Sequence, residues 1–143
     1  MKKFDFPLEK ILKLRRFQQE QAEIELGKAL QEEQAIQNKL DSIARQHAAA
    51  AANIKGSLDF EVISSAQQFF RLLEIQKEAL LNDLAEAKLV SEQKRRVLQE
   101  KMKKTASLEK LGEEEYEKYR RESFREEEAV VDDIINSHFG RKN

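Results

Sequence analysis

The stretch from Leu58 to Phe139 contains no proline and only one glycine, Gly112. About eighty residues without a strong helix breaker favour one continuous helix, which at 1.5 Å per residue would be roughly 120 Å long. A helix of that length cannot bury itself within a domain of 143 residues. The sequence therefore predicts an elongated helix, with the first 57 residues packed along part of it.

The composition supports this prediction. Charged residues make up 37% of the chain and aromatic residues 7%, and the 26 basic side chains nearly balance the 27 acidic ones. Such a chain, with a single proline, is typical of long helices and coiled coils. The absence of cysteine excludes disulfides, thiolate metal sites and cysteine nucleophiles, and fits a reducing compartment. We find no targeting segment and no apolar run long enough to span a membrane, so we expect a soluble protein.

Apolar residues in the first part of the chain recur in alternating steps of four and three, the spacing of a coiled-coil seam. Ten of the fourteen positions reached in this way are apolar. The fourteen positions are Leu8, Leu12, Arg15, Gln19, Ala22, Leu26, Ala29, Glu33, Ile36, Leu40, Ile43, His47, Ala50 and Ile54. We expect one helix here, with Pro7 in its first turn and Asp5 as its N-cap. Ile11, Leu14 and Phe17 lie off the seam and form a second apolar surface.

A reversal is predicted between the two parts of the chain. Gly56 is a C-cap candidate, and Ser57 and Asp59 behind it are N-cap candidates for a second helix. A connection this short makes neighbouring helices antiparallel. The seam then continues with Ala66, Phe70, Leu73, Lys77, Leu80, Leu84, Ala87, Ser91, Lys94 and Leu98, and its apolar character weakens after Leu84.

These patterns predict an all-α fold, a two-helix antiparallel coiled coil in which the longer second helix overhangs the first. We expect one hairpin domain over residues 1–143, with helices over about 7–54 and 60–139 and a turn over about 55–59. A reversal centred near Ser57 would place Leu8 opposite Ala106.

With that register, no part of the first helix covers the segment from Leu108 to Phe139. Large apolar side chains recur there and cluster toward its end, which predicts a partner-binding surface. They are Leu108, Leu111, Tyr116, Tyr119, Phe124, Val130, Val131, Ile134, Ile135 and Phe139.

Charge is segregated along the second helix. Lys88–Lys104 holds seven bases and two acids, whereas Glu109–Asp133 holds eleven acids and five bases. A solvated face with local pairs such as Glu114–Lys118 and Glu117–Arg121 would explain these bands, and so would electrostatic docking onto an oriented partner.

No catalytic constellation is found. The glycines at 27, 56, 112 and 140 are too far apart to form a phosphate-binding loop. His47 and His138 lack neighbours at metal-ligand spacing, and a two-helix rod offers no pocket that excludes water. We therefore expect no cofactor, no metal and no enzymatic activity.

The basic residues raise the question of two classes of anionic partner, nucleic acids and membrane surfaces. The bases at Lys94–Arg96 and at Lys101, Lys103 and Lys104 do not indicate nucleic-acid binding, because the chain has no overall basic excess and no recognised reading module. Binding to a membrane surface is an accessory prediction, because basic and apolar residues mix near the amino end. That set comprises Lys2, Lys3, Lys10, Lys13, Arg15 and Arg16 with Phe4, Phe6 and Ile11.

Three features give the chain a family resemblance. They are the opening Phe4-x-Phe6-x-Leu8-x-x-x-Leu12-x-x-Arg15, the run Gln67-Gln68-Phe69 after the reversal, and an acidic tail (Glu127, Glu128, Asp132, Asp133) leading to Phe139. In these features and in length and layout, the chain resembles the flagellar type III export protein FliJ.

The resemblance implies a stalk-like coiled coil, similar to the gamma-type subunit of rotary ATPases. Members of that family bind the ring-shaped export ATPase, contact the cytoplasmic part of the export gate and handle substrate chaperones, without being enzymes. It implies a cytoplasmic protein at the flagellar base, peripherally associated with the inner membrane, and we expect a monomer when it is free. The alternatives are the equivalent stalk of a virulence type III secretion system, or a generic cytoplasmic scaffold that self-associates through the overhang.

Geometry divides the predicted partner-binding residues between the two ends of the hairpin. At the end that carries the termini we expect contacts with the ATPase, and at the reversal contacts with the gate. The ATPase set is Phe4, Phe6, Arg15, Arg16, Tyr116, Tyr119, Phe124 and Phe139, and the gate set is Phe69 and Phe70.

Overall fold

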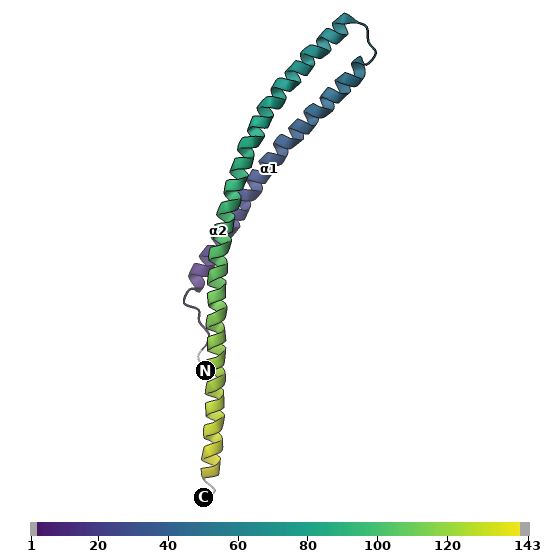
Figure 1. Ribbon diagram of the computed structural model, residues 1–143. Helices are drawn as coiled ribbons and strands as arrows, with labels where there is room; N and C mark the ends of the chain where they lie inside the picture. Colours follow the sequence, from purple (N-terminus) through teal and green to yellow (C-terminus); the bar gives the residue numbers. More distant parts are fainter. Residues whose placement is uncertain (1–2, 141–143) are drawn as a thin grey trace. The chain divides into compact units, whose positions relative to one another are not determined.

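The computed structural model describes residues 3–140 and contains two helices, α1 (Glu9–Ile54) and α2 (Phe60–Gly140) (Figure 1). They comprise 46 and 81 residues. No strand occurs within residues 3–140. The helices pack against each other in antiparallel directions and the second is the longer, which confirms the predicted fold class.

Contacts divide the chain into two units, and each unit holds a piece of both helices. Unit 1 comprises residues 1–20 and 100–143, and unit 2 comprises residues 21–99. The termini, the start of α1 and the overhanging end of α2 all belong to unit 1. The reversal belongs to unit 2.

The reversal in unit 2 is closed by capping interactions. Gly56 has a φ of 80°, the left-handed conformation that glycine adopts most readily at the end of a helix. The Ser57 amide donates to the Ile54 carbonyl (3.1 Å). The Asp59 carboxylate then accepts a hydrogen bond from the Glu61 amide (3.0 Å), which makes Asp59 the N-cap of α2. Both predicted caps are therefore present.

The start of α1 differs from the prediction. The Glu9 amide donates to the Phe6 carbonyl (3.0 Å), so a turn containing Pro7 precedes the helix. The Leu8 carbonyl accepts the first i to i−4 hydrogen bond, at 2.9 Å. The residue that accepts this bond is by definition the N-cap, so the N-cap is Leu8 and not Asp5.

The seam in unit 2 is built largely from small residues. Its buried apolar positions are Ala22, Ala29, Ile43, Ala66, Leu73 and Ala87. All six belong to the predicted heptad ladder. Two other ladder positions, His47 and Lys77, are exposed, because a seam between only two helices leaves its longer polar side chains partly open to water.

Packing continues where the apolar pattern weakens, because small hydroxyl side chains can enter the seam. Ser91 and Thr105 are both buried. The Ser91 hydroxyl lies 3.1 Å from Glu33 Oε1 on α1 and 3.1 Å from the Lys88 carbonyl. The Thr105 hydroxyl donates to the Lys101 carbonyl (2.9 Å). Both buried hydroxyls are thus satisfied, as burial of a polar group requires.

The predicted register is wrong. Arg16, which a reversal centred on Ser57 would place opposite Leu98, pairs with Glu109 at 3.3 Å. One cause lies at the reversal. In unit 2, α2 begins beyond the end of α1 (Figure 1), which moves every later pairing toward the carboxyl end of α2.

Candidate partner-binding site

The segment before α1, residues 3–8, lies along α2 and is here named the strap. Phe6 in the strap is only 7% exposed. Its ring packs on Gly112, where an added Cβ atom would lie 3.3 Å from Phe6 Cε2. The one glycine in the interior of α2 therefore provides the space that the Phe6 ring fills. Because Phe6 is buried within unit 1, its side chain leaves little surface for a partner and instead packs the strap onto α2.

Three aromatic rings form a cluster next to this contact. The Phe4 ring lies 5.2 Å from Tyr116 in an edge-to-face arrangement and 5.3 Å from Tyr119 in a tilted one. Phe4 and Tyr119 are half-buried, whereas Tyr116 is exposed. The aromatic cluster (Phe4, Tyr116, Tyr119) thus joins residues that are far apart in the sequence and keeps an open face. It also shows that the strap covers α2 as far as Tyr119, so the overhang begins near residue 120 and not at Leu108.

The two predicted arginines lie on α1 beside the strap. Arg16 is exposed and pairs with Glu109 across the two helices. Arg15 is half-buried, and its guanidinium donates to the Gln18 side chain at 3.4 Å. An exposed ion pair of this kind contributes little to stability, so the Arg16 side chain can exchange its partner at low free-energy cost.

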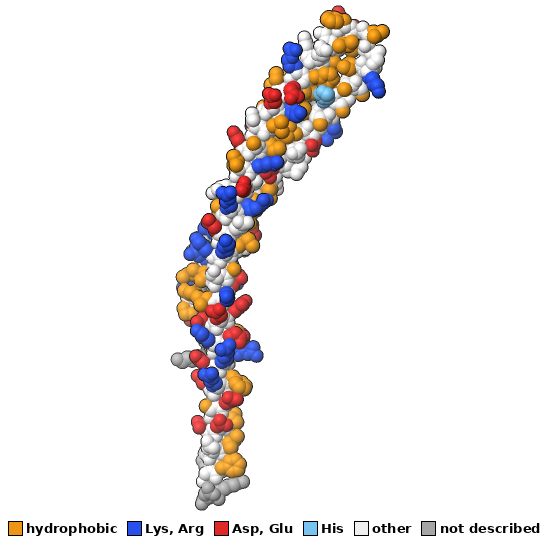
Figure 2. All heavy atoms as spheres, in the orientation of Figure 1, with side chains coloured by type: hydrophobic (Ala, Val, Ile, Leu, Met, Phe, Trp, Pro, Cys, Tyr) orange, Lys and Arg blue, Asp and Glu red, His pale blue; other side chains and the backbone are white. Residues whose placement is uncertain are grey.

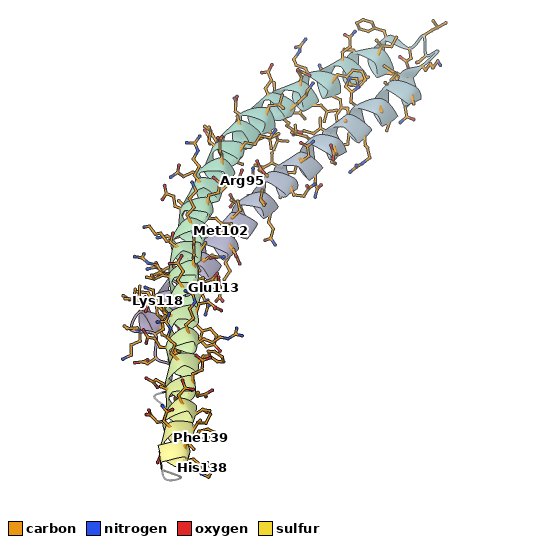
Figure 3. All side chains as sticks on the ribbon, turned by 60° about the horizontal axis from the view of Figure 1, so that its bottom comes forward. Arg95, Met102, Glu113, Lys118, His138 and Phe139 are labelled. Carbon is orange, nitrogen blue, oxygen red and sulfur yellow. The ribbon has the colours of Figure 1, made fainter. Side chains whose placement is uncertain are left out.

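The overhang, residues 120–140 of α2, carries apolar side chains that no part of the described chain covers. Ile134 and Phe139 are each 63% exposed, and Figure 2 shows hydrophobic side chains along one edge of this end. Phe139 lies next to His138 near the end of the helix (Figure 3), with 6.2 Å between the ring centroids. The exposed apolar residues are Phe124, Val130, Val131, Ile134, Ile135 and Phe139.

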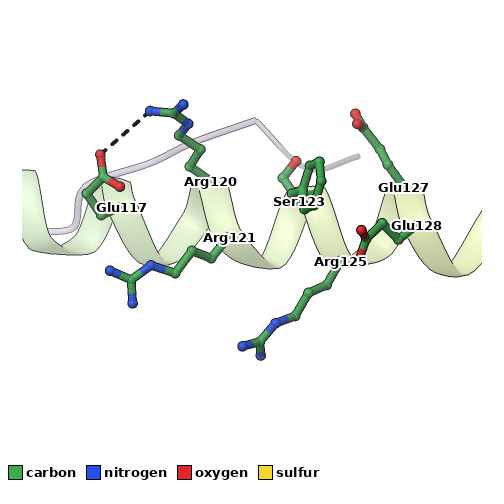
Figure 4. Close-up of a pocket in the computed structure, with 8 residues that line it drawn as sticks. Glu117, Arg120, Arg121, Ser123, Arg125, Glu127 and Glu128 are labelled. Carbon is green, nitrogen blue, oxygen red and sulfur yellow. Dashed lines mark ion pairs between the residues drawn. The ribbon is translucent and has the colours of Figure 1, made fainter.

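The charged surface at the start of the overhang is an open depression and not a closed pocket. Arg121 and Arg125 project to one side of α2, while Glu117 and Arg120 project to the other and pair at 3.9 Å (Figure 4). The local ion pairs differ from the predicted ones, because Glu117 pairs with Arg120 and Lys118 pairs with Glu115, three residues away in each case. Such a surface can bind a charged partner.

Within residues 3–140, no three histidine, aspartate or glutamate side chains are grouped so that they could hold a metal ion. No helix in that range is both long and apolar enough to cross a membrane.

A comparison with protein-family models identifies the chain. The model described as the flagellar FliJ protein matches residues 4–143. The chain belongs to the FliJ family. It is accordingly a component of the flagellar export apparatus, and the match takes in the strap, the hairpin and the overhang. No curated protein and no solved structure matches the chain.

The other two predicted partner-binding residues, Phe69 and Phe70, lie near the reversal of this FliJ family member. The Phe70 ring is half-buried and lies 4.4 Å from the His47 ring, so α1 covers part of it. Phe69 is exposed. Two residues that sequence reasoning missed, Leu58 and Phe60, are the most exposed large apolar side chains described, at 97% and 80%. The sequence signal for their exposure is their position next to Ser57 and Asp59, the polar cap candidates of the reversal.

The predicted membrane-binding set is not brought together as a single surface. Phe6 is buried and Arg16 is paired, while Lys2 lies outside the described residues. Lys10 and Lys13 are exposed on α1. The basic surface near the amino end of this FliJ family member is therefore smaller than the sequence indicated.

Proposed function

We propose that this FliJ family member is a stalk that binds the export ATPase ring through unit 1. The observation that carries the proposal is the overhang, a helix that presents six large apolar side chains next to the open aromatic cluster. Apolar residues that recur on one face of a helix are suited to a groove on another protein. A stalk at the centre of a ring would face several subunits, and each subunit could present such a groove.

Electrostatics would orient the docking. Residues 120–140 hold six acidic and three basic side chains. A binding site with a basic rim would attract this end and speed association, and salt would screen the attraction. Because the overhang is apolar as well as acidic, the contact would keep part of its affinity at high salt.

We place the contact with the export gate at the reversal, in unit 2. Phe69 is exposed there, and Leu58 and Phe60 add apolar surface that the caps at Gly56 and Asp59 hold in a defined conformation. A preorganised loop loses less conformational entropy on binding than a flexible one. Substrate chaperones are a third class of partner in this proposal, and no particular residue is assigned to them.

The protein would act by binding and not by chemistry. It would change the assembly and turnover rate of the ATPase ring because one stalk contacts several subunits. The measurement is therefore the ATPase rate and ring assembly of the export ATPase, with and without this protein.

Two pairs of alanine variants test the proposal. Tyr119→Ala with Phe139→Ala should weaken ATPase binding by at least 10-fold, since an anchoring aromatic residue contributes on the order of 1–2 kcal/mol or more. The matched control, Leu58→Ala with Phe69→Ala, should leave ATPase binding unchanged and weaken binding to the cytoplasmic part of the gate. Unchanged ATPase binding in the first pair would refute the assignment of unit 1.

A further inference from the structure

A second uncovered face lies on α1 in unit 1, opposite the side that packs on α2. Leu12 is buried against α2, whereas Leu14 and Phe17 are 53% and 56% exposed. Lys10, Lys13, Leu14 and Phe17 occupy positions i, i+3, i+4 and i+7, so they share one face of the helix. We name these four residues the basic face.

The overhang presents a face of the same spacing and opposite charge. Glu128, Val131, Asp132 and Ile135 also occupy positions i, i+3, i+4 and i+7, and Phe139 follows Ile135 by four residues. All are exposed. We name these five residues the acidic face. Each face therefore combines two like charges with exposed apolar side chains.

The charges on both faces are available to a partner. Across residues 3–140, the ion pairs involve neither the lysines of the basic face nor the acids of the acidic face. The two faces of one molecule cannot meet, because α2 is one continuous helix to Gly140 and its overhang runs on past the strap. A second copy of the chain is the occupant that the structure itself supplies.

We propose that the free protein forms an antiparallel homodimer in which the acidic face of each copy packs on the basic face of the other. The contacts of Arg16 with Glu109 and of Phe6 with Gly112 place the basic face beside residues 109–112 of α2. A two-fold axis near residue 120 brings residue 131 of one copy to the level of residue 109 of the other, about 16 Å from the axis. The same operation forms the contact twice, as in other isologous dimers.

This dimer departs from the monomer expected from the sequence. The heptad pattern places Leu14 and Phe17 off the seam. Only the packing of α1 on α2 shows that they point away from α2, on the same face as Lys10 and Lys13. The dimer would also cover the overhang. If the proposed function is right, dimerisation and ATPase binding exclude each other, and the dimer is a storage form of the free stalk.

The first test is the oligomeric state of the full chain. Sedimentation equilibrium at micromolar concentrations should show a monomer–dimer equilibrium that added salt weakens. The variant Lys10→Glu/Lys13→Glu should raise the dissociation constant at least about 100-fold, because like charges then face each other. The variant Glu128→Lys/Asp132→Lys should do the same.

A mixing experiment distinguishes this dimer from any other. Each charge-reversal variant repels itself, but in an equimolar mixture both contacts pair opposite charges, so the mixture should form a heterodimer. Far-UV circular dichroism should show unchanged helix content, since all four positions are exposed. The control Lys39→Glu/Lys55→Glu changes two exposed lysines of unit 2 and should leave the dimer intact.

Three results would overturn the proposal. They are a wild-type chain that stays monomeric at high concentration, variants that still self-associate, and a mixture that does not dimerise. A monomeric wild type that binds anionic phospholipid vesicles through Lys10 and Lys13 would instead assign the basic face to a membrane. None of these measurements contains the ATPase, so they can fail while the proposed function holds.

Discussion

Substitutions at Gly112 measure how firmly the strap is held. Gly112→Ala improves helix propensity by about 0.8–1 kcal/mol. Its Cβ atom would lie 3.3 Å from the Phe6 ring, and the ring can move by a few tenths of an ångström because the strap is not helical. We expect Gly112→Ala to stabilise the protein by slightly less than the full propensity gain.

Gly112→Leu separates the packing contribution from the propensity. Alanine and leucine have nearly equal helix propensities, but a leucine side chain would occupy the position of the Phe6 ring. Burial of a phenylalanine side chain contributes about 1.5–3 kcal/mol. The leucine side chain would itself bury apolar surface and so recover part of this free energy. We therefore expect Gly112→Leu to be about 2 kcal/mol less stable than Gly112→Ala.

Urea unfolding followed by far-UV circular dichroism supplies the free energies. Gly27 in α1 is the control, because a Cβ atom there would meet nothing within 4 Å. Gly27→Ala and Gly27→Leu should therefore stabilise the chain by similar amounts. In a Phe6→Ala background the difference between the two Gly112 variants should nearly vanish. If Gly112→Leu is as stable as Gly112→Ala in the unaltered background, the Phe6 ring does not occupy this site and the description of the strap is wrong.

Further predictions concern the caps, an ion pair and the overhang. Asp59→Ala removes the N-cap of α2 and should lower the free energy of unfolding by about 1 kcal/mol, whereas Asp59→Asn should lower it much less. Gly56→Ala should lower it by about 1–2 kcal/mol, because a φ of 80° is strained for alanine; both effects are read from urea midpoints. Arg16→Ala should lower stability by less than about 1 kcal/mol, since its pair with Glu109 is exposed, and a larger loss in urea would contradict this. In hydrogen exchange of the monomeric variant Lys10→Glu/Lys13→Glu, amide protection should fall sharply after Tyr119; strong protection through its overhang would show that the overhang needs no partner to stay folded.

The seam could be predicted from the sequence because its physical cause is local. Steps of four and three place residues on one face of a helix, and Leu73, Ala87 and Ser91 are buried at positions that this rule assigns. The caps were equally local, since Gly56 and Asp59 act on their own neighbours in the chain.

The register and the aromatic cluster were beyond the sequence pattern, because both depend on groups distant along the chain. An offset between the helices at the reversal moves every later pairing, and no single residue encodes that offset. The Phe6 contact depends on the missing side chain of Gly112, which as a sequence feature looks only like a weak point in a helix. Sequence reasoning did name Phe4, Tyr116 and Tyr119, but it did not foresee that they touch.

The caps at the reversal also determine the order in which the chain can fold. Closing the short loop held by Gly56 and Asp59 carries little entropic cost, and each later layer of the seam closes against its neighbour. The sequence separation of cross-helix contacts grows away from the loop, from 58 residues for Ser91 and Glu33 to 93 for Arg16 and Glu109. In a nascent chain, the contacts between α1 and α2 can thus form from the reversal outward as soon as α2 is synthesised. The aromatic cluster forms last, so an incomplete chain would lack the contacts that hold the strap on α2.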